Sequence, residues 1–304
     1  MNEIHIEPTG ATLGAVVSGV ELRSLDDADW TLIEDAFHEH GVLVFPQQHL
    51  TAEEQTAFAR RFGELSIETM TFTNCTEDGS LLPSDDPLMR HLAGNEGWHT
   101  DSSFQDLAAK ASMLSARRVP AHGGQTEWAD MRAAYDALDD AMCRRIEGLR
   151  AFHSLYYSQA RLGVDPSVTA AANARLGGRR TTVDLPVVVE APLRPLVKVH
   201  PVTGRRALFV GRHAYGIVGM DPDESRQLLD ELNEWACQPP RVHRHTWQAG
   251  DLAVWDNRCV LHRARPYDPN EARFMVHTRV AGDPATEHAA MVAAPPITVA
   301  AASA

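Results

Sequence analysis

The stretch Leu252-Ala-Val-Trp-Asp-Asn-Arg-Cys-Val-Leu-His262 opens with a short β-like run, Leu252–Asp256, and ends at a histidine. Other short β-like runs lie far away along the chain, at Gly41–Pro46, Ala111–Val119, Leu196–His200, Ala207–Gly211 and Phe274–Val280. Connections this long are typical of a Greek-key or jelly-roll barrel, whereas a doubly wound sheet would alternate strand and helix regularly. We therefore expect a mainly β protein with flanking helices and a double-stranded β-helix (jelly-roll) core.

Helices are predicted at three places. The segment Asp27–His40 has apolar residues at helical spacing. A second helix opens with the capping-box sequence Thr51-Ala-Glu-Glu54 and closes on Phe62-Gly63. The third begins at Asp221, which can cap its first turn, and carries a stripe that we expect to be buried, made of Leu228, Leu229, Leu232 and Trp235.

The chain has no internal repeat and no linker with a change of composition, so we expect a single domain over residues 1–290. Two stretches have weak periodicity, 66–97 and 158–186, and loops that long are commonly lids or binding loops. We expect them to determine which substrate is bound. The Ala-rich tail, 291–304, has no amphipathic pattern and is predicted to be disordered.

Composition narrows the class of protein. With 41 acidic and 28 basic residues the formal net charge is −13, which repels phosphate backbones and anionic lipid, so neither nucleic acid nor membrane is an expected partner. The opening MNEIHIEPTG has no secretory pattern, and we expect a cytoplasmic enzyme. The scattered cysteines suggest neither a zinc knuckle nor a disulfide framework. No coiled coil or single apolar stripe is identifiable, which leaves homo-oligomer formation open.

Histidines that accompany carboxylates at ligand spacing are the candidates for chemistry. The pairs His5-Ile-Glu7 and His99-Thr-Asp101 could each present two ligands on one side of an extended chain, and chance often produces such tripeptides. His262, 163 residues after His99, and Arg273, eleven residues further on, favour the second pair. Two histidines and one carboxylate on one face of an ion are typical of non-haem Fe(II) oxygenases. A zinc hydrolase would accept the same ligands, but Arg273 has no obvious purpose there.

The sequence resembles the Fe(II)- and 2-oxoglutarate-dependent dioxygenases of the taurine dioxygenase (TauD/TfdA) family, and among them the aryloxyalkanoate dioxygenases. The resemblance runs from about residue 4 to residue 289 and includes Pro8-Thr-Gly-Ala-Thr-Leu-Gly-Ala, Trp98-His-Thr-Asp101, Met131-Arg-Ala-Ala-Tyr-Asp-Ala-Leu-Asp, His153-Ser-Leu, Leu193-Arg-Pro-Leu-Val-Lys-Val-His-Pro, Gly211-Arg-His-Ala, Trp235-Ala-Cys and Trp255-Asp-Asn-Arg-Cys. It implies Fe(II) as the metal, with 2-oxoglutarate and O₂ as co-substrates.

Carried to this chain, the resemblance implies that His99, Asp101 and His262 bind iron. It places Thr126 and Arg273 at the far carboxylate of 2-oxoglutarate. A guanidinium is independently suited to that position, because it pairs with a carboxylate through two hydrogen bonds and stays charged in a desolvated pocket.

The substrate side departs from the taurine enzymes. They place a substrate-binding arginine where this chain has His277, which weakens a sulfonate assignment. Arg279 could replace the missing charge or join Arg273, since alternate residues of this strand share one face. Asn95 matches a pocket position of the family, and His213 is a further candidate for the pocket.

The resemblance implies hydroxylation of a small anionic, carboxylate-bearing substrate, with release of succinate and CO₂. If the attacked carbon bears an ether oxygen, the product is a hemiacetal or hemiketal that collapses and cleaves the ether. The alternatives are an alkylsulfonate or natural-product hydroxylase of the same family, a zinc hydrolase, and a non-catalytic jelly-roll binding protein.

Overall fold

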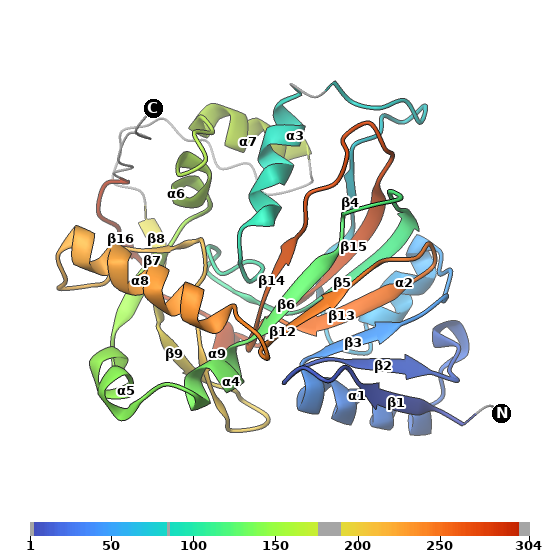
Figure 1. Ribbon diagram of the computed structural model, residues 1–304, viewed down its shortest axis with the longest axis horizontal. Helices are drawn as coiled ribbons and strands as arrows, with labels where there is room; N and C mark the ends of the chain where they lie inside the picture. Colours follow the sequence, from blue (N-terminus) through green and yellow to red (C-terminus); the bar gives the residue numbers. More distant parts are fainter. Residues whose placement is uncertain (1–2, 84–85, 176–189, 298–304) are drawn as a thin grey trace.

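The computed structural model describes residues 3–83, 86–175 and 190–297 and is mostly β, with helices around the strands (Figure 1). Its largest sheet has seven strands in the order β1-β2-β3-β13-β5-β15-β4. These strands are β1 (His5–Pro8), β2 (Ala15–Ser18), β3 (Val42–Phe45), β4 (Leu65–Thr73), β5 (Ala109–Arg118), β13 (Leu252–Asp256) and β15 (Phe274–Ala281). The predicted run Leu252–Asp256 therefore lies at the centre of the sheet, between partners far from it in sequence.

Smaller sheets complete the β structure. One has the order β12-β6-β14, made of Val242–His245, Thr126–Asp130 and Val260–Ala264. A second has the order β11-β7-β8-β16, made of Ala214–Tyr215, Arg150–His153, Glu190–Pro195 and Met291–Ala293, and a hairpin pairs β9 (Val197–Val199) with β10 (Arg206–Leu208). Because β14 follows β13 after a short turn, the chain passes directly from the large sheet to the β12-β6-β14 sheet.

Alternating side chains place a hydrophobic core on each face of the large sheet. On β3, Leu43 and Phe45 point into one core, whereas Val42 and Val44 point into the other. The first core is covered by α1 (Asp27–His40) and α2 (Ala52–Ala59). The two helices lie against this sheet in Figure 1.

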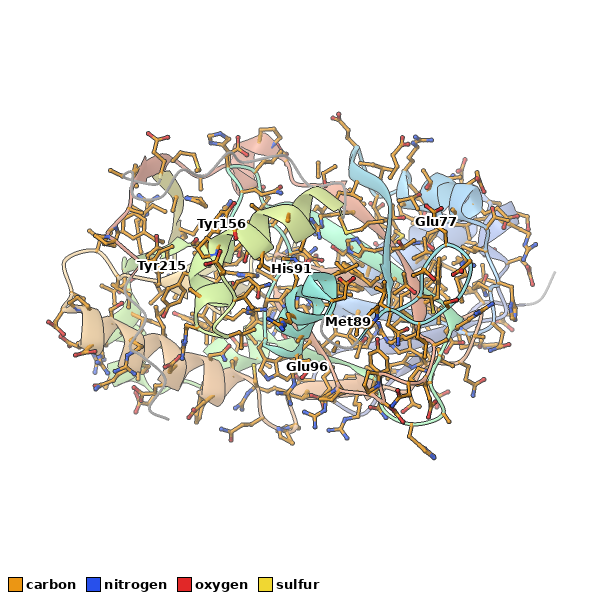
Figure 2. The ribbon with its side chains drawn as sticks, turned by 90° about the horizontal axis from the view of Figure 1, so that it is seen from above. Glu77, Met89, His91, Glu96, Tyr156 and Tyr215 are labelled. Atoms are coloured by element: carbon orange, nitrogen blue, oxygen red, sulfur yellow. The ribbon has the colours of Figure 1, made fainter. Side chains whose placement is uncertain are left out.

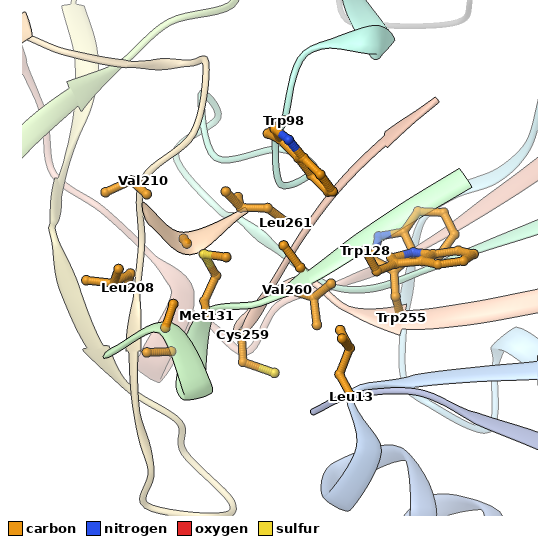
Figure 3. Close-up of a cluster of buried hydrophobic side chains, with 14 of the residues drawn as sticks. Leu13, Trp98, Trp128, Met131, Leu208, Val210, Trp255, Cys259, Val260 and Leu261 are labelled. Carbon is orange, nitrogen blue, oxygen red and sulfur yellow. The ribbon is translucent and has the colours of Figure 1, made fainter. Parts of the chain in front are cut away.

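The second core lies between the large sheet and the β12-β6-β14 sheet. Trp255 and Trp128 are fully buried in it, with ring centroids 6.0 Å apart, and Val260 and Leu261 of β14 join them. Figure 3 shows these side chains together with Trp98. Since Trp98 precedes His99 and Leu261 precedes His262, this core supports the backbone on both sides of the predicted metal site.

The predicted helices are present, with differences at two ends. α1 has the expected bounds, and the capping box of Thr51 and Glu54 is formed at α2. α2 ends at Ala59, before the expected Phe62-Gly63, because the chain there continues as turns. α8 (Pro222–Ala236) is capped by Asp221. Its Trp235 is not buried as predicted but 38% exposed, and its indole N–H donates to the Ala134 carbonyl.

Both stretches of weak periodicity contain regular structure. Residues 66–97 include most of β4, α3 (Pro87–Ala93) and η2 (Gly94–Glu96). The second stretch includes the end of α6 (Leu155–Ala160) and all of α7 (Pro166–Arg175), while residues 176–189 lie outside the described part. The remaining elements are η1 (Leu22–Ser24), α4 (Met131–Asp136), α5 (Asp140–Ile146) and α9 (Pro284–Glu287).

The predictions for the C-terminal tail and for the cysteines can be compared with the structure in part. Residues 291–293, which were expected to be disordered, form β16 and pair with β8, whereas 298–304 lie outside the described residues. All four cysteines are free thiols. No helix in the described part of the chain combines the length and the apolar character needed to cross a membrane.

A buried ion pair fixes the turn between β13 and β14. Arg258 donates through Nε to Asp256 Oδ1 at 2.8 Å and through Nη2 to Oδ2 at 2.6 Å. His200 Nε2 also lies 2.9 Å from Asp256 Oδ2. Burial alone would raise the pKa of Asp256, but Arg258 and His200 hold that pKa below its usual range. The turn that leads to His262 is therefore held by a charged network.

Replacing Arg258 by Met should destabilise the fold strongly, because Asp256 would keep its charge in a buried place without its main partner. We expect the free energy of unfolding to fall by about 3–5 kcal/mol in urea titrations. Arg60→Met, which breaks the exposed Arg60–Glu68 pair, is the control and should cost at most about 1 kcal/mol. Equal losses in the two variants would show that the buried network does not stabilise the turn.

Candidate active site

A pair of backbone hydrogen bonds brings the two predicted histidine ligands together. His99 N–H donates to the His262 carbonyl at 3.0 Å, and His262 N–H donates to the His99 carbonyl at 2.7 Å. His99 lies in the loop between η2 and β5, whereas His262 lies in the middle of β14. This bridge places side chains that are remote in sequence side by side.

His99, Asp101 and His262 form a compact set of possible ligands. One ligand atom from each residue lies within 4.8 Å of the others, and all three residues are largely buried. His99 Nδ1 lies 2.8 Å from the Gly97 carbonyl, so this nitrogen carries the hydrogen and Nε2 keeps its lone pair. His262 Nε2 lies 3.9 Å from Asp101 Oδ2. The three side chains thus converge on one point, as the sequence predicts.

The carboxylate of Asp101 is held by groups from two strands. Ser112 Oγ on β5 donates to Oδ2 at 2.6 Å, and Arg279 Nη2 on β15 donates to Oδ1 at 3.2 Å. His277 Nε2, also on β15, lies 3.5 Å from Oδ2. Burial would raise the pKa of Asp101, but Arg279 and the nearby histidines hold it well below the ordinary value. The carboxylate is therefore ionised and oriented.

Asn257 connects this carboxylate to the turn after β13. Its Nδ2 donates to Ser112 Oγ at 2.9 Å, which leaves the Ser112 hydroxyl hydrogen for Asp101. Its Oδ1 accepts from Asp101 N–H at 3.2 Å and from Trp255 Nε1 at 3.1 Å. The Thr100 hydroxyl donates to the Asn257 carbonyl at 2.8 Å. One amide side chain thus fixes both the backbone and the carboxylate of Asp101.

Burial keeps the two histidines neutral. It lowers the pKa of His99 and brings that of His262 well below its usual value, even though Asp101 acts in the opposite direction in both cases. Neutral imidazoles have the lone pairs that metals require. Two imidazoles and one carboxylate are the ligand set of non-haem Fe(II) oxygenases, so the side chains present fit that ion.

Arg273 is a buried cation directly before β15, the strand that carries His277 and Arg279. It is 8% exposed, its guanidinium lies over the Tyr267 ring at 5.6 Å, and Nη2 is 3.4 Å from the Gly124 carbonyl. Burial lowers the pKa of Arg273 from its very high ordinary value. None of the ion pairs among the described residues involves Arg273. A buried guanidinium without a carboxylate partner is suited to an anionic ligand.

The backbone beside Arg273 is shaped by a glycine. Gly124 has φ +67°, and a Cβ there would lie 3.3 Å from Arg273 Nε, so a larger residue would crowd the guanidinium. Thr126, two residues further on, is buried at the start of β6, and its Oγ1 accepts a hydrogen bond from Trp247 Nε1 at 2.9 Å. That bond directs the Thr126 hydroxyl hydrogen away from Trp247, toward another acceptor.

A second cluster, of His200, Asp256 and Cys259, has comparable spacing but is already satisfied. His200 Nδ1 accepts from the backbone N–H groups of Val202 and Thr203, so Nε2 is the protonated nitrogen and donates to Asp256. Burial raises the pKa of the Cys259 thiol, which keeps it protonated. This cluster offers no free ligand set and is structural.

Comparison with known proteins agrees with the site. Residues 5–280 match the family model described as taurine catabolism dioxygenase TauD, TfdA family. The chain belongs to the TauD/TfdA family of dioxygenases. It is 52% identical, over 93% of its own length and 97% of the relative, to a (S)-phenoxypropionate/alpha-ketoglutarate-dioxygenase of Sphingobium herbicidovorans. It is 40% identical, over 88% and 93%, to an alpha-ketoglutarate-dependent 2,4-dichlorophenoxyacetate dioxygenase of Cupriavidus pinatubonensis.

A solved structure shows a similar fold with ligands bound. The crystal structure of AAD-2 in complex with Mn(II) and N-oxalylglycine is 39% identical, with a TM-score of 0.83 over 95% of this chain and 100% of that one. As a TauD/TfdA dioxygenase, this chain is an enzyme of a class that uses Fe(II), 2-oxoglutarate and O₂.

The predicted substrate residues occupy different surroundings in this TauD/TfdA dioxygenase. His213 is buried, with Nδ1 2.8 Å from Ser158 Oγ and its ring 5.8 Å from that of His99 and 4.9 Å from that of Phe104. Asn95 is half-buried in η2, which comes just before the loop of His99. His213 therefore lies beside His99, whereas the contacts of Asn95 do not assign it to the site.

His277 and Arg279 both face Asp101. Arg279 Nη1 also donates to Ser102 Oγ at 3.0 Å, so its guanidinium is bound to the loop that holds His99 and Asp101. Of the two alternatives for Arg279, a place beside Arg273 is not among its contacts, which are with Asp101 and Ser102. This geometry favours a role at Asp101 over the predicted role as a substrate anchor.

A half-buried arginine, Arg212, which the sequence interpretation left without a role, links elements near His99. Arg212 N–H donates to the Trp98 carbonyl at 2.8 Å, and its guanidinium donates to the carbonyls of Gly94 and Ser158. It thereby ties α6 to η2. Figure 2 shows His91 on α3 and Tyr156 on α6, and Gln159 of α6 donates to the His91 carbonyl at 3.2 Å. The only sequence signal for a role of Arg212 is its position next to His213 in the motif Gly211-Arg-His-Ala.

His153 is a buried histidine whose two ring nitrogens both lack hydrogen-bond partners among the described residues. Its ring packs on Phe209 with centroids 5.5 Å apart. Burial, followed by the charges of Arg194 and Lys198, lowers its pKa from 6.5 to about 3. His153 therefore stays neutral in the folded protein under conditions that protonate it in the unfolded chain.

This shift makes stability depend on pH. A depressed folded-state pKa contributes stability that is complete above the unfolded value of about 6.5 and is lost as the pH falls toward the folded value. His153→Phe should therefore flatten the pH dependence of the unfolding free energy by about 1.4 kcal/mol per pH unit between pH 6 and pH 4. Urea titrations measure this, with His5→Phe on the exposed end of β1 as the control. Parallel curves for wild type and His153→Phe would contradict it.

Proposed function

We propose that this protein is an Fe(II)- and 2-oxoglutarate-dependent dioxygenase that cleaves aryloxyalkanoic acids at the ether bond. The observation that carries the proposal is the combination of the His99, Asp101 and His262 set with Arg273, a buried cation outside the ion pairs of the described residues. A metal hydrolase needs the first feature but has no use for the second. The (S)-phenoxypropionate and 2,4-dichlorophenoxyacetate dioxygenases similar to this chain indicate the substrate class.

The metal and the co-substrate have separate places in this proposal. When bound by His99, Asp101 and His262, Fe(II) supplies chelation of the 2-oxo acid and activation of O₂, while 2-oxoglutarate is oxidised to succinate and CO₂. Arg273 binds the far carboxylate of 2-oxoglutarate through its guanidinium, and the Thr126 hydroxyl adds a donor. These contacts orient the co-substrate before the substrate enters.

The proposed reaction balances without a further reactant. One oxygen atom from O₂ enters succinate, and the other is inserted into the C–H bond of the carbon that bears the ether oxygen. The resulting hemiketal or hemiacetal then breaks its bond to the aryloxy group. The aryloxy oxygen takes the hydroxyl proton and leaves as a phenol, and the remaining fragment becomes a 2-oxo acid.

Positive charge around the site supports an anionic substrate. Arg279 is a buried cation and Arg212 a half-buried one, and each contributes to lowering the pKa of His99. His213, bound at Nδ1 to Ser158, has Nε2 available to a ligand, and Asn95 adds an amide. We infer that His213 and Asn95 contact the polar end of the substrate, while Arg212 and Arg279 add positive charge around it without contacting it. His277, where the taurine enzymes have an arginine, lies against Asp101 instead, which favours a carboxylate over a sulfonate.

The jelly-roll fold is part of the same proposal. We infer that the large sheet and the β12-β6-β14 sheet, packed through the core of Trp255 and Trp128, are the two halves of a jelly roll. A single domain over residues 1–290, a cytoplasmic location and the capacity to form homo-oligomers stay predictions of the sequence.

The activity is tested by incubating the protein with Fe(II), 2-oxoglutarate, O₂ and a panel of (S)-2-phenoxypropionate, phenoxyacetate, taurine and an alkyl sulfate. We expect equimolar succinate and phenol from the phenoxy acids. His99→Ala should form neither product while it retains the circular dichroism spectrum of the folded protein. Turnover of taurine or the alkyl sulfate alone would favour the sulfonate alternative, and hydrolysis without O₂ and 2-oxoglutarate would establish the zinc hydrolase.

The role of Arg273 can be tested with two inhibitors. N-oxalylglycine has the far carboxylate of 2-oxoglutarate, whereas oxalate lacks it. Arg273→Met should weaken N-oxalylglycine binding by about 100-fold, because a buried charged contact is lost, and should leave oxalate binding nearly unchanged. Equal effects on the two inhibitors, measured by competition against 2-oxoglutarate, would exclude Arg273 as the anchor of the far carboxylate.

A further inference from the structure

Arg279 is a buried cation that contacts a metal ligand. Its side chain is about as buried as Asp101 itself, and Nη2 donates to Asp101 Oδ1 at 3.2 Å. Nη1 donates to Ser102 Oγ at 3.0 Å, while Nε has no partner among the described residues. The guanidinium therefore donates hydrogen bonds to two consecutive residues, Asp101, the proposed metal ligand, and Ser102.

The residue after the metal ligand has an unusual backbone. Ser102 has φ +57°, in the left-handed region that costs energy for residues other than glycine. This conformation turns the chain sharply after Asp101, and the Gln105 N–H closes the turn on the Ser102 carbonyl at 2.9 Å. By holding the Ser102 hydroxyl and the Asp101 carboxylate together, Arg279 stabilises this turn.

The two oxygens of Asp101 have different partners. Oδ2 receives the short hydrogen bond of Ser112, at 2.6 Å, and is the oxygen that lies 3.9 Å from His262 Nε2. Oδ1 receives the longer bond of Arg279, at 3.2 Å. Ser112 is therefore the closer orienting contact on the oxygen nearer the second histidine, whereas Arg279 adds a full positive charge on the other oxygen.

We propose that Arg279 is a positioning residue that compensates the charge of Asp101 in the metal-free site, so that it weakens divalent-metal binding and strengthens binding of the anionic co-substrate. This inference rests on the proposed function of the site. The direction of both effects follows from Coulomb's law, since a fixed cation repels a divalent metal cation and attracts a dianion in the same buried space. Ser112, which is uncharged, should act through orientation alone.

The test measures Mn(II) binding to metal-free protein by the EPR signal of free Mn(II), without co-substrate. Arg279→Met should bind Mn(II) about tenfold more tightly, because the repulsion is removed. The Mn(II)-loaded variant should bind N-oxalylglycine about tenfold more weakly, for the opposite reason. Arg279→Lys keeps the charge and should restore both values, while Ser112→Ala should weaken Mn(II) binding about tenfold by loss of orientation.

Controls separate this inference from the proposed function. Arg132→Met removes a buried arginine paired with Asp130, away from the site, and should change stability without changing either affinity. His99→Ala should abolish tight Mn(II) binding; if it does not, the metal site and this inference both fail. If His99→Ala behaves as expected but Arg279→Met binds Mn(II) unchanged or more weakly, only the role of Arg279 is overturned. If Arg279→Met does not fold, Arg279→Gln, which keeps an amide donor without charge, should show the same two opposite shifts.

Discussion

An ionised carboxylate buried within a β core is the constraint on which this structure depends. Removing Asp101 from water would protonate it unless hydrogen bonds and a cation compensate. Its partners come from separate parts of the sheet: Ser112 from β5, Arg279 from β15 and Asn257 from the turn after β13. The order β13-β5-β15 in the large sheet is what brings them together. The strand order that forms the large sheet therefore also assembles the partners of Asp101.

The fold was predictable where side-chain periodicity is strong. Leu252–Asp256 is buried at every residue and has the bounds expected, and Phe274–Val280 is extended by one residue in β15. The prediction did not include β6, β12 and β14, and it was wrong for β4 and β16, which it placed in a loop and in a disordered tail. Both are edge strands with half-exposed side chains, so neither has the apolar run or the clean alternation that identifies a strand.

His99, Asp101 and His262 could be proposed as metal ligands from the sequence, because their residue types and spacing indicate that chemistry. The residues that support them could not. No sequence pattern marks Ser112 as a residue of the site. Its place opposite Trp255 is set by the pairing of β5 with β13, and that register depends on tertiary structure. Arg279 was correctly expected to share a strand face with His277, but whether it faced substrate, co-substrate or metal ligand depended on where Asp101 lies.

The reciprocal backbone bonds between His99 and His262 have a consequence for how the site comes apart. They are non-covalent, and they join a loop to a strand that belongs to a different part of the chain. If the bridge opens, His99 and Asp101 leave together and His262 stays behind on β14. Under the proposed function, departure of the ion and local unfolding of the loop would be a single cooperative event, so an occupied site would protect the loop from proteases and an empty one would expose it.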